Sequence, residues 1–247
     1  MNSTLDKLSD WLHWVLDRWS ISATPSGWAI LLALAVIGAT ITYRPVWVIL
    51  RHGVTIVHEM GHVVMGWLWG RRIEGISLHT DTSGLTITAG RPRGLGVLMT
   101  YLAGYPSPAL VGLGLIWAST SGWSGAALTL VVLLLLQAFW LVRNIFGLVT
   151  VSIALALSGW VLYEADPKIV TTFTVVVGIF LLLSAARGAF DLWSLHARGG
   201  SEADTSDASM AARHSLLPAK VWVVLFGAFA GTCAFYAGGM LVVAITG

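Results

Sequence analysis

The chain has 247 residues, of which 56% are hydrophobic and only 11% are charged, and its mean hydropathy is +0.80. A soluble domain carries roughly twice that charged fraction, so the composition indicates an integral membrane protein. The net charge of +2 is too small to indicate a nucleic-acid partner. The single cysteine, Cys233, excludes a disulfide framework and a metal site built from cysteines.

The first 26 residues are expected to form an amphipathic helix that lies on the membrane surface. Its apolar face comprises Leu5, Leu8, Leu12, Val15, Leu16 and Trp19, which recur at helical spacing. Charged residues such as Lys7, Asp10 and Arg18 lie opposite, and they interrupt any apolar segment of the kind found in a signal peptide. We therefore separate residues 1–26 from an integral membrane domain at 27–247.

About seven apolar stretches follow, each close to the ~20 residues that a helix needs to cross a bilayer. They lie at residues 27–43, 45–69, 96–118, 124–142, 145–163, 168–186 and 220–245. The predicted fold is an all-α polytopic membrane protein with about seven transmembrane helices. A small membrane-associated β-hairpin is expected at residues 74–90, because apolar residues alternate there around a turn at 81–84. The alternation predicts one apolar face, formed by Ile76, Leu78, Leu85 and Ile87.

The distribution of basic residues predicts which side of the membrane each loop faces. With seven crossings, the N-terminus shares one face with residues 70–95, 143–144 and the loop at 187–219. Most Lys and Arg residues fall on that face, whereas the other face keeps only Arg44, Arg51 and Lys168. The positive-inside rule therefore predicts a multi-pass protein of the cell membrane whose N-terminus is cytoplasmic.

The most informative motif is His58-Glu59-Met60-Gly61-His62, which lies inside the second apolar stretch. Residues four apart share one face of a helix, so His58 and His62 can direct two imidazoles at one metal ion. Glu59 is close enough to act on a metal-bound water as a general base. This arrangement is typical of zinc hydrolases, and ionisable residues within a membrane segment are functional candidates by default.

A catalytic zinc site needs a third protein ligand. Because the motif lies towards the cytoplasmic side, the candidates are the acidic residues predicted on that side. These are Asp81, Asp191, Glu202, Asp204 and Asp207. Spacing alone does not choose among them.

Several motifs together resemble the site-2-protease type of intramembrane zinc metalloprotease, and most closely its bacterial B-like branch. VHEMGH is followed by a hairpin sequence SLHTDTSGLT and then by AGYPSPA at the start of the next span. An Arg-Asn-x-x-Gly element is matched by Arg143, Asn144 and Gly147, and a Ser-Asp-Ala element by residues 206–208. The resemblance covers roughly residues 51–225.

The resemblance implies a membrane-embedded zinc metallopeptidase whose partners are the lipid bilayer and a transmembrane protein substrate. His58 and His62 would be ligands of Zn²⁺, and Glu59 would be the general base. Arg143 or Asn144 would donate hydrogen bonds to the developing oxyanion. The active site would lie on the cytoplasmic side.

The identity of the third ligand is where this chain departs from better-known members of the wider family. Those members carry an Asp on a later helix in an Asn-Pro-Asp-Gly-like or Leu-Asp-Gly element, yet no Asp follows Asn144 in NIFGLVTV. The Ser-Asp-Ala element favours Asp207. Asn144, Asp204 and Asp191 stay open as alternatives.

Other functions are compatible with the same residues. The chain would be a non-catalytic metal- or haem-binding membrane protein, or a transporter, if the histidines only bound a ligand. It would be an inactive protease relative if it bound transmembrane helices without cutting them. Glu59 favours hydrolysis, because a site that only binds a ligand has no need of a carboxylate beside the first histidine.

Overall fold

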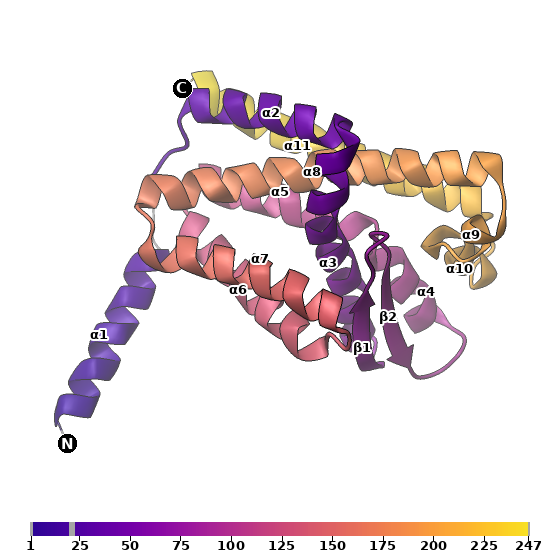
Figure 1. Ribbon diagram of the computed structural model, residues 1–247, viewed down its shortest axis with the longest axis horizontal. Coiled ribbons are helices and arrows are strands. Elements are labelled where there is room, and N and C mark those ends of the chain that lie inside the picture. The colour runs from indigo at the N-terminus through magenta and orange to yellow at the C-terminus, as the bar shows by residue number, and fades with distance from the viewer. Residues whose placement is uncertain (1, 20–22, 247) are drawn as a thin grey trace.

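The structure is a computed structural model that describes residues 2–19 and 23–246. Eleven helices and two strands are present within these ranges (Figure 1). In chain order they are α1 (Asn2–Trp19), α2 (Gly27–Thr42), α3 (Arg44–Leu68), β1 (Arg72–Leu78), β2 (Gly84–Ala89), α4 (Leu95–Ala103), α5 (Pro106–Thr120), α6 (Ser124–Leu141), α7 (Ile145–Glu164), α8 (Pro167–Arg198), α9 (Ser201–Asp204), α10 (Asp207–Arg213) and α11 (Ala219–Thr246).

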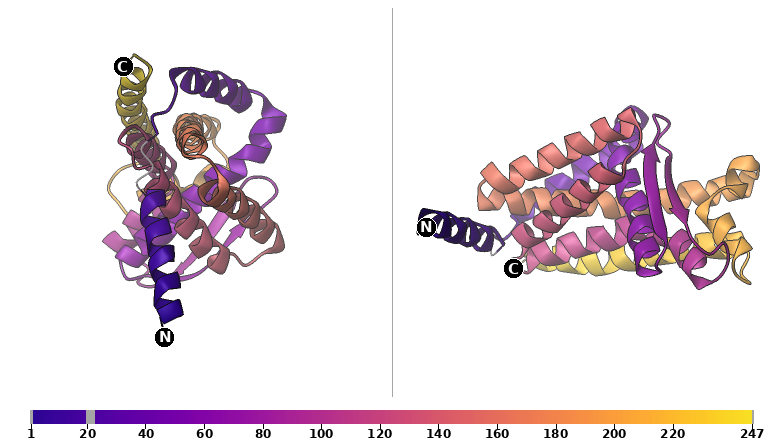
Figure 2. Two further views of the ribbon diagram at one scale, coloured as in Figure 1. Left: turned by 90° about the vertical axis from the view of Figure 1, so that its left-hand side faces the viewer. Right: turned by 90° about the horizontal axis from the view of Figure 1, so that it is seen from below.

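Long apolar helices form a bundle around α8. Helices α2, α5, α8 and α11 run side by side and share one core, to which Ile37, Ile116, Ile179 and Ala237 contribute (Figures 1 and 2). Helices α5 and α8 approach each other closely, since a Cβ added at Gly112 would lie 2.8 Å from the carbonyl oxygen of Gly178. Helices α6 and α7 pack together beside this group.

Helix α3 crosses the bundle at a steep angle instead of running along it (Figure 1). The axes of α2 and α3 differ by 106° across the short break between them. Pro45 lies in the first turn of α3, and its ring and missing N–H prevent α2 from continuing into α3 as one helix. The bend holds α3 and its HEMGH motif across the end of the bundle, against the hairpin.

The predicted hairpin is present and packs on α3. Strands β1 and β2 are antiparallel, with Ile76 opposite Thr86 and Leu78 opposite Gly84. Ile76 and Leu78 are buried with Ile56, Met60 and Val63 of α3. Leu85 and Ile87 lie on the opposite face and are exposed, so the prediction of one apolar face shared by all four residues is wrong. The face of β2 towards α3 carries Gly84 and Thr86 instead.

The count of seven transmembrane helices is not confirmed. Helices α6, α7, α8 and α11 are each long and apolar enough to cross a membrane, and the bent pair α2–α3 brings the number of candidates to five. The predicted second span therefore belongs to a bent pair. The predicted third span is divided into α4 and α5, which end and begin on either side of Gly104 and Tyr105, directly before Pro106.

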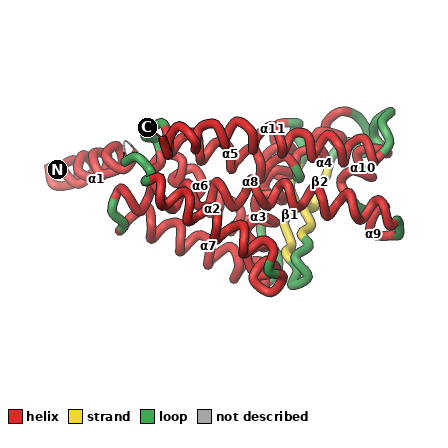
Figure 3. The backbone as a smooth tube through the Cα atoms, turned by 90° about the horizontal axis from the view of Figure 1, so that it is seen from above, coloured by secondary structure: helices red, strands yellow, loops and turns green. Residues whose placement is uncertain are grey.

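The two ends of the chain lie at the same end of the bundle. A Cβ added at Gly27 would lie 3.4 Å from the Ile245 backbone, and Arg18 donates a hydrogen bond to the Ala165 carbonyl between α7 and α8. Helices α9 and α10 lie at the other end, together with the hairpin (Figure 3). The structure therefore differs from the prediction that the N-terminus shares a face with the loop at 187–219, because the bent α2–α3 pair does not add two crossings.

Helix α1 forms as predicted, and its Leu16 and Trp19 side chains are exposed. The side chains of Leu5, Leu8, Leu12 and Val15 lie outside the described part of the structure, as do residues 20–22. That α1 lies on the membrane surface stays a prediction.

The loop at 187–219 is more structured than its composition suggests. Helix α8 has 32 residues and continues to Arg198, which makes it about 48 Å long and longer than the ~30 Å hydrocarbon core of a bilayer. The segment after it folds into α9 and α10, which pack against α8, α4 and α11. This packing brings α10 back towards α3.

Candidate metal centre

Two histidines of α3 point to the same side of the helix. His58 and His62 are one turn apart, and their Nε2 atoms are 3.2 Å from each other. Glu59 follows His58 directly and is buried on an adjacent face of the helix. All three side chains are held by one continuous helix of 25 residues, so their relative positions are fixed.

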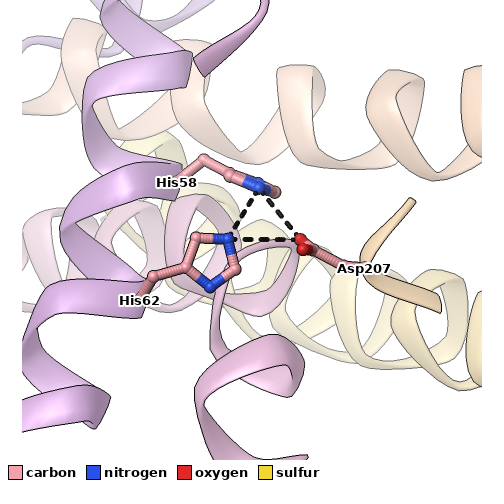
Figure 4. A group of neighbouring side chains, drawn as sticks. All are labelled: His58, His62 and Asp207. Atoms are coloured by element: carbon pink, nitrogen blue, oxygen red, sulfur yellow. Dashed lines mark hydrogen bonds and ion pairs between the residues drawn. The ribbon is translucent and has the colours of Figure 1, made fainter. Parts of the chain in front are cut away.

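Asp207 approaches both histidines from α10 (Figure 4). Its Oδ2 atom is 3.0 Å from His58 Nε2 and 3.3 Å from His62 Nε2. Asp207 is the first residue of α10, and the Ser206 hydroxyl before it accepts a hydrogen bond from the Ser209 N–H. This cap fixes the start of α10 and therefore the direction of the carboxylate.

The spacing of these atoms suits a metal ion. Ligands about 2.0–2.2 Å from a tetrahedral zinc lie about 3.4 Å from one another, close to the three separations here. Asp207 Oδ2 is buried and has no hydrogen-bond partner among the described atoms. Two imidazole nitrogens and one carboxylate are also a usual donor set for zinc. The residues therefore fit a metal ion.

Electrostatics keep the Asp207 carboxyl in the form that can bind a cation. Burial alone would raise the pKa of Asp207, but the facing imidazoles of His62 and His58 outweigh it. The net effect holds the pKa of Asp207 well below its ordinary value.

Helix α4 fixes the orientation of His62. Its Nδ1 is 2.7 Å from the Thr100 carbonyl oxygen, which can only accept a hydrogen bond. Nδ1 must therefore carry a proton, so Nε2 is the nitrogen that would bind a metal. A Cβ added at Gly104 would lie 2.6 Å from atoms of both imidazoles, so no larger residue fits between α4 and the two rings.

Strand β2 holds the carboxylate of Glu59. The Thr86 hydroxyl donates a hydrogen bond of 2.6 Å to Glu59 Oε2. A Cβ added at Gly84 would be 2.7 Å from the Glu59 carboxyl carbon, so a glycine is needed where the strand passes over Glu59. The face of the hairpin towards α3 therefore carries no apolar side chain at Gly84 or Thr86, and the Glu59 carboxylate fills the space there.

Arg143 and Asn144 are not part of the metal group. Asn144 Nδ2 donates to the Leu78 carbonyl at 2.6 Å, and its Oδ1 accepts from the Leu78 N–H at 3.1 Å. Arg143 donates from its backbone N–H to Ile76 and from Nε to Glu74. Both residues therefore bind the outer edge of β1.

The structure does not bring the remaining acidic candidates into the group, as far as the described residues extend. Asp191 forms an ion pair of 3.9 Å with Arg187, one turn before it on α8. Asp81 accepts hydrogen bonds from Ser83 in the hairpin loop, which lowers the pKa of Asp81. Asp204 and Glu202 lie on α9.

Sequence reasoning missed Thr86, Gly84, Thr100 and Gly104 as contributors to the site. Gly104 lies in the AGYPSPA motif, so its position carried a signal. Thr86 and Gly84 alternate regularly with Leu85 and Ile87, so the β2 sequence carried no signal that its polar face would be the one towards α3. Thr100 contributes only a backbone carbonyl, which any residue would supply.

Comparison with known families agrees with this geometry. The model of the Peptidase M50B-like family matches residues 28–237, and the chain therefore belongs to this site-2-protease family. Peptidases of this kind are membrane-embedded and zinc-dependent, and the group of His58, His62 and Asp207 is compatible with such a metal site. No curated protein and no solved structure matches the chain.

Proposed function

We propose that this protein is a zinc-dependent intramembrane endopeptidase that hydrolyses peptide bonds in or near transmembrane segments of other proteins. The observation that carries the proposal is the spacing of His58 Nε2, His62 Nε2 and Asp207 Oδ2 beside the buried Glu59. Membership of the M50B-like family supports it.

The chain's own residues would divide the chemistry as follows. His58, His62 and Asp207 would hold a zinc ion, which when bound supplies a Lewis acid and lowers the pKa of a water molecule. Glu59 would accept the proton of that water and pass it to the leaving amine. The Thr86 hydroxyl would keep the Glu59 carboxylate in one orientation for both transfers.

The hairpin offers an edge for the substrate. A helical substrate hides its peptide groups in internal hydrogen bonds, so it must unwind locally before attack. The outer edge of β1 is already occupied, since Ile76 pairs with Val142 and Leu78 is held by Asn144. Arg143 and Asn144 would therefore support the hairpin, and this role is favoured over donation to an oxyanion.

The opposite edge, on β2, is free among the described residues. The Ile76 carbonyl points away from β2 and accepts a hydrogen bond from the Arg143 N–H. Ile76 and its partner Thr86 are therefore a non-hydrogen-bonded pair of the antiparallel sheet. The N–H and C=O of Thr86 consequently point to the free edge, next to Glu59. An unwound segment added there as a strand would lie beside the general base.

The orientation in the membrane follows from the basic residues. Arg71, Arg72, Arg91, Arg93, Arg143, Arg198, Arg213 and Lys220 lie in or beside the connections at the end that carries the candidate site. Lys7, Arg18 and Lys168 belong to the opposite end. We infer from the positive-inside rule that the site opens towards the cytoplasm of a cell membrane.

The test compares the full chain with Glu59→Gln in proteoliposomes that contain a library of single-span transmembrane peptides. We expect the wild type to release fragments, whereas Glu59→Gln lowers the rate by at least about 10²-fold, the scale of general-base catalysis. Zinc content measured by mass spectrometry should be unchanged in the variant. Full zinc occupancy without any wild-type cleavage would favour the inactive relative, and zinc loss in Glu59→Gln would contradict the assigned role of Glu59.

A further inference from the structure

A separate cavity opens between the start of α4 and the connection from α10 to α11. It has a volume of about 380 Å³ and is lined by Arg93, Gly94, Arg213, His214, Ser215 and Leu216. Two of the six residues are arginines and a third is a histidine. Among the described residues, no carboxylate lines the cavity or lies within ion-pair distance of Arg93 or Arg213. The charge of this hollow is therefore suited to an anion.

Neighbouring side chains hold the walls of this basic cavity in place. The His214 ring stacks on Tyr101 of α4 at a centroid distance of 5.9 Å and an angle of 12°. Trp222 Nε1 donates to Ser215 Oγ at 2.9 Å, and Arg213 Nη2 donates to the Asp204 carbonyl at 3.1 Å. These contacts already order the walls, so binding imposes little further ordering.

The basic cavity lies beside the start of a candidate membrane span and next to exposed leucines. Leu216, on its wall, is fully exposed and precedes by three residues the start of α11, a candidate membrane span. Leu95, next to Gly94, has 64% of its surface exposed. Exposed leucines beside arginines that have no ion-pair partner among the described residues are expected where acyl chains meet phosphates.

We propose that the basic cavity binds the phosphate of an anionic phospholipid. Arg93 contacts the phosphate from the α4 side and Arg213 from the α10 side, since guanidinium groups match phosphate oxygens in pairs. Leu95 and Leu216 contact the acyl chains. A bound lipid therefore links α4 to α10, the helix that carries Asp207. Binding itself does not depend on a metal ion or on peptide hydrolysis.

The test uses the full chain in nanodiscs of phosphatidylcholine with a minor fraction of phosphatidylglycerol, and native mass spectrometry to count the lipids that stay bound. Arg93→Gln/Arg213→Gln should lower retained phosphatidylglycerol by at least about fivefold, the effect of one interfacial arginine or more. The control Arg72→Gln/Arg198→Gln removes two exposed arginines outside the cavity and should retain most of the lipid. Equal retention in wild type and cavity variant, or an equal loss in the control, would overturn the proposal.

A second measurement needs no variant. A photoactivatable phosphatidylglycerol should label peptides containing residues 91–95 and 213–217 of the wild type, and excess inorganic phosphate should not displace it. Labelling only of peptides outside residues 91–95 and 213–217 would overturn the assignment of the lipid to this cavity. Displacement by inorganic phosphate would overturn a lipid as the source of the anion.

Discussion

Gly104 leaves the space in which both imidazoles of the candidate metal centre sit. A Cβ in Gly104→Ala would lie 2.6 Å from atoms of His58 and His62, so one ring or the backbone of α4 must move. We expect zinc affinity to fall by about 10- to 100-fold, as when groups that orient metal ligands are disturbed. Titration with a competing chelator measures this change. Gly114→Ala is the control, because nothing lies within 4 Å of an added Cβ there, and equal losses would show a general packing effect.

Asp207 and Asp204 provide a second comparison between single residues. Asp207→Ala removes the only carboxylate in the His58–His62 group of the described residues and should reduce zinc content about as much as His62→Ala. Asp204→Ala removes an acid three residues away and should leave zinc content unchanged. Metal analysis of the three purified variants tests the assignment. Normal zinc in Asp207→Ala would exclude this carboxylate as a ligand.

At the scale of residues, the sequence predicts the parts of the site that a short motif contains. His58, Glu59 and His62 follow from helical spacing alone. Asp207 is 145 residues beyond His62, so only a family resemblance favoured it over Asp191 or Asp204. Thr86 and Thr100 act through a hydroxyl and a carbonyl brought close by tertiary packing, which no local pattern records.

The β2 strand is the element on which the proposed substrate site depends. Thr86→Val removes the hydroxyl that holds Glu59 but keeps the backbone N–H at the free edge. Thr86→Pro removes both, and proline is tolerated at an edge position whose N–H faces outwards. Cleavage of a transmembrane peptide should fall by about tenfold in Thr86→Val, because a hydrogen bond to a charged group contributes about 1.5–3 kcal/mol.

Cleavage should fall further in Thr86→Pro, and mainly through a higher KM, since strand addition binds the substrate through N–H groups at the edge. Zinc content should be the same in both variants. Identical kinetics for valine and proline would contradict strand addition at this edge.

At the scale of elements, hydropathy predicts α6, α7, α8 and α11 to within a few residues at most ends. It predicts the break at Pro45 but not that the helices on either side form one bent pair. It misses the break before Pro106, where the expected span at 96–118 is divided into α4 and α5. It also fails for the hairpin register, because Gly84 and Thr86 face α3 beside Glu59 while Leu85 and Ile87 face outwards.

For the whole molecule, the contact between Gly27 and Ile245 predicts the topology. Reporters fused before residue 1 and after Gly247 should be found on the same side of the membrane, and a reporter within residues 199–206 on the other. Compartment-specific labelling of each fusion in intact cells measures this. Opposite locations for the two terminal fusions would contradict the placement of Gly27 beside Ile245 and the arrangement of α2 and α3.

The assignment of the third ligand to α10 has a consequence during biosynthesis. If Asp207 completes the metal site, the nascent chain carries both imidazole ligands but lacks the carboxylate ligand until 145 further residues have been added after His62. At 5–20 residues per second this interval lasts roughly 7–30 s. The nascent protein therefore inserts most of its helices before it can hold zinc firmly. If the protein is the proposed endopeptidase, the order in which its ligands are translated would protect neighbouring membrane proteins from premature cleavage.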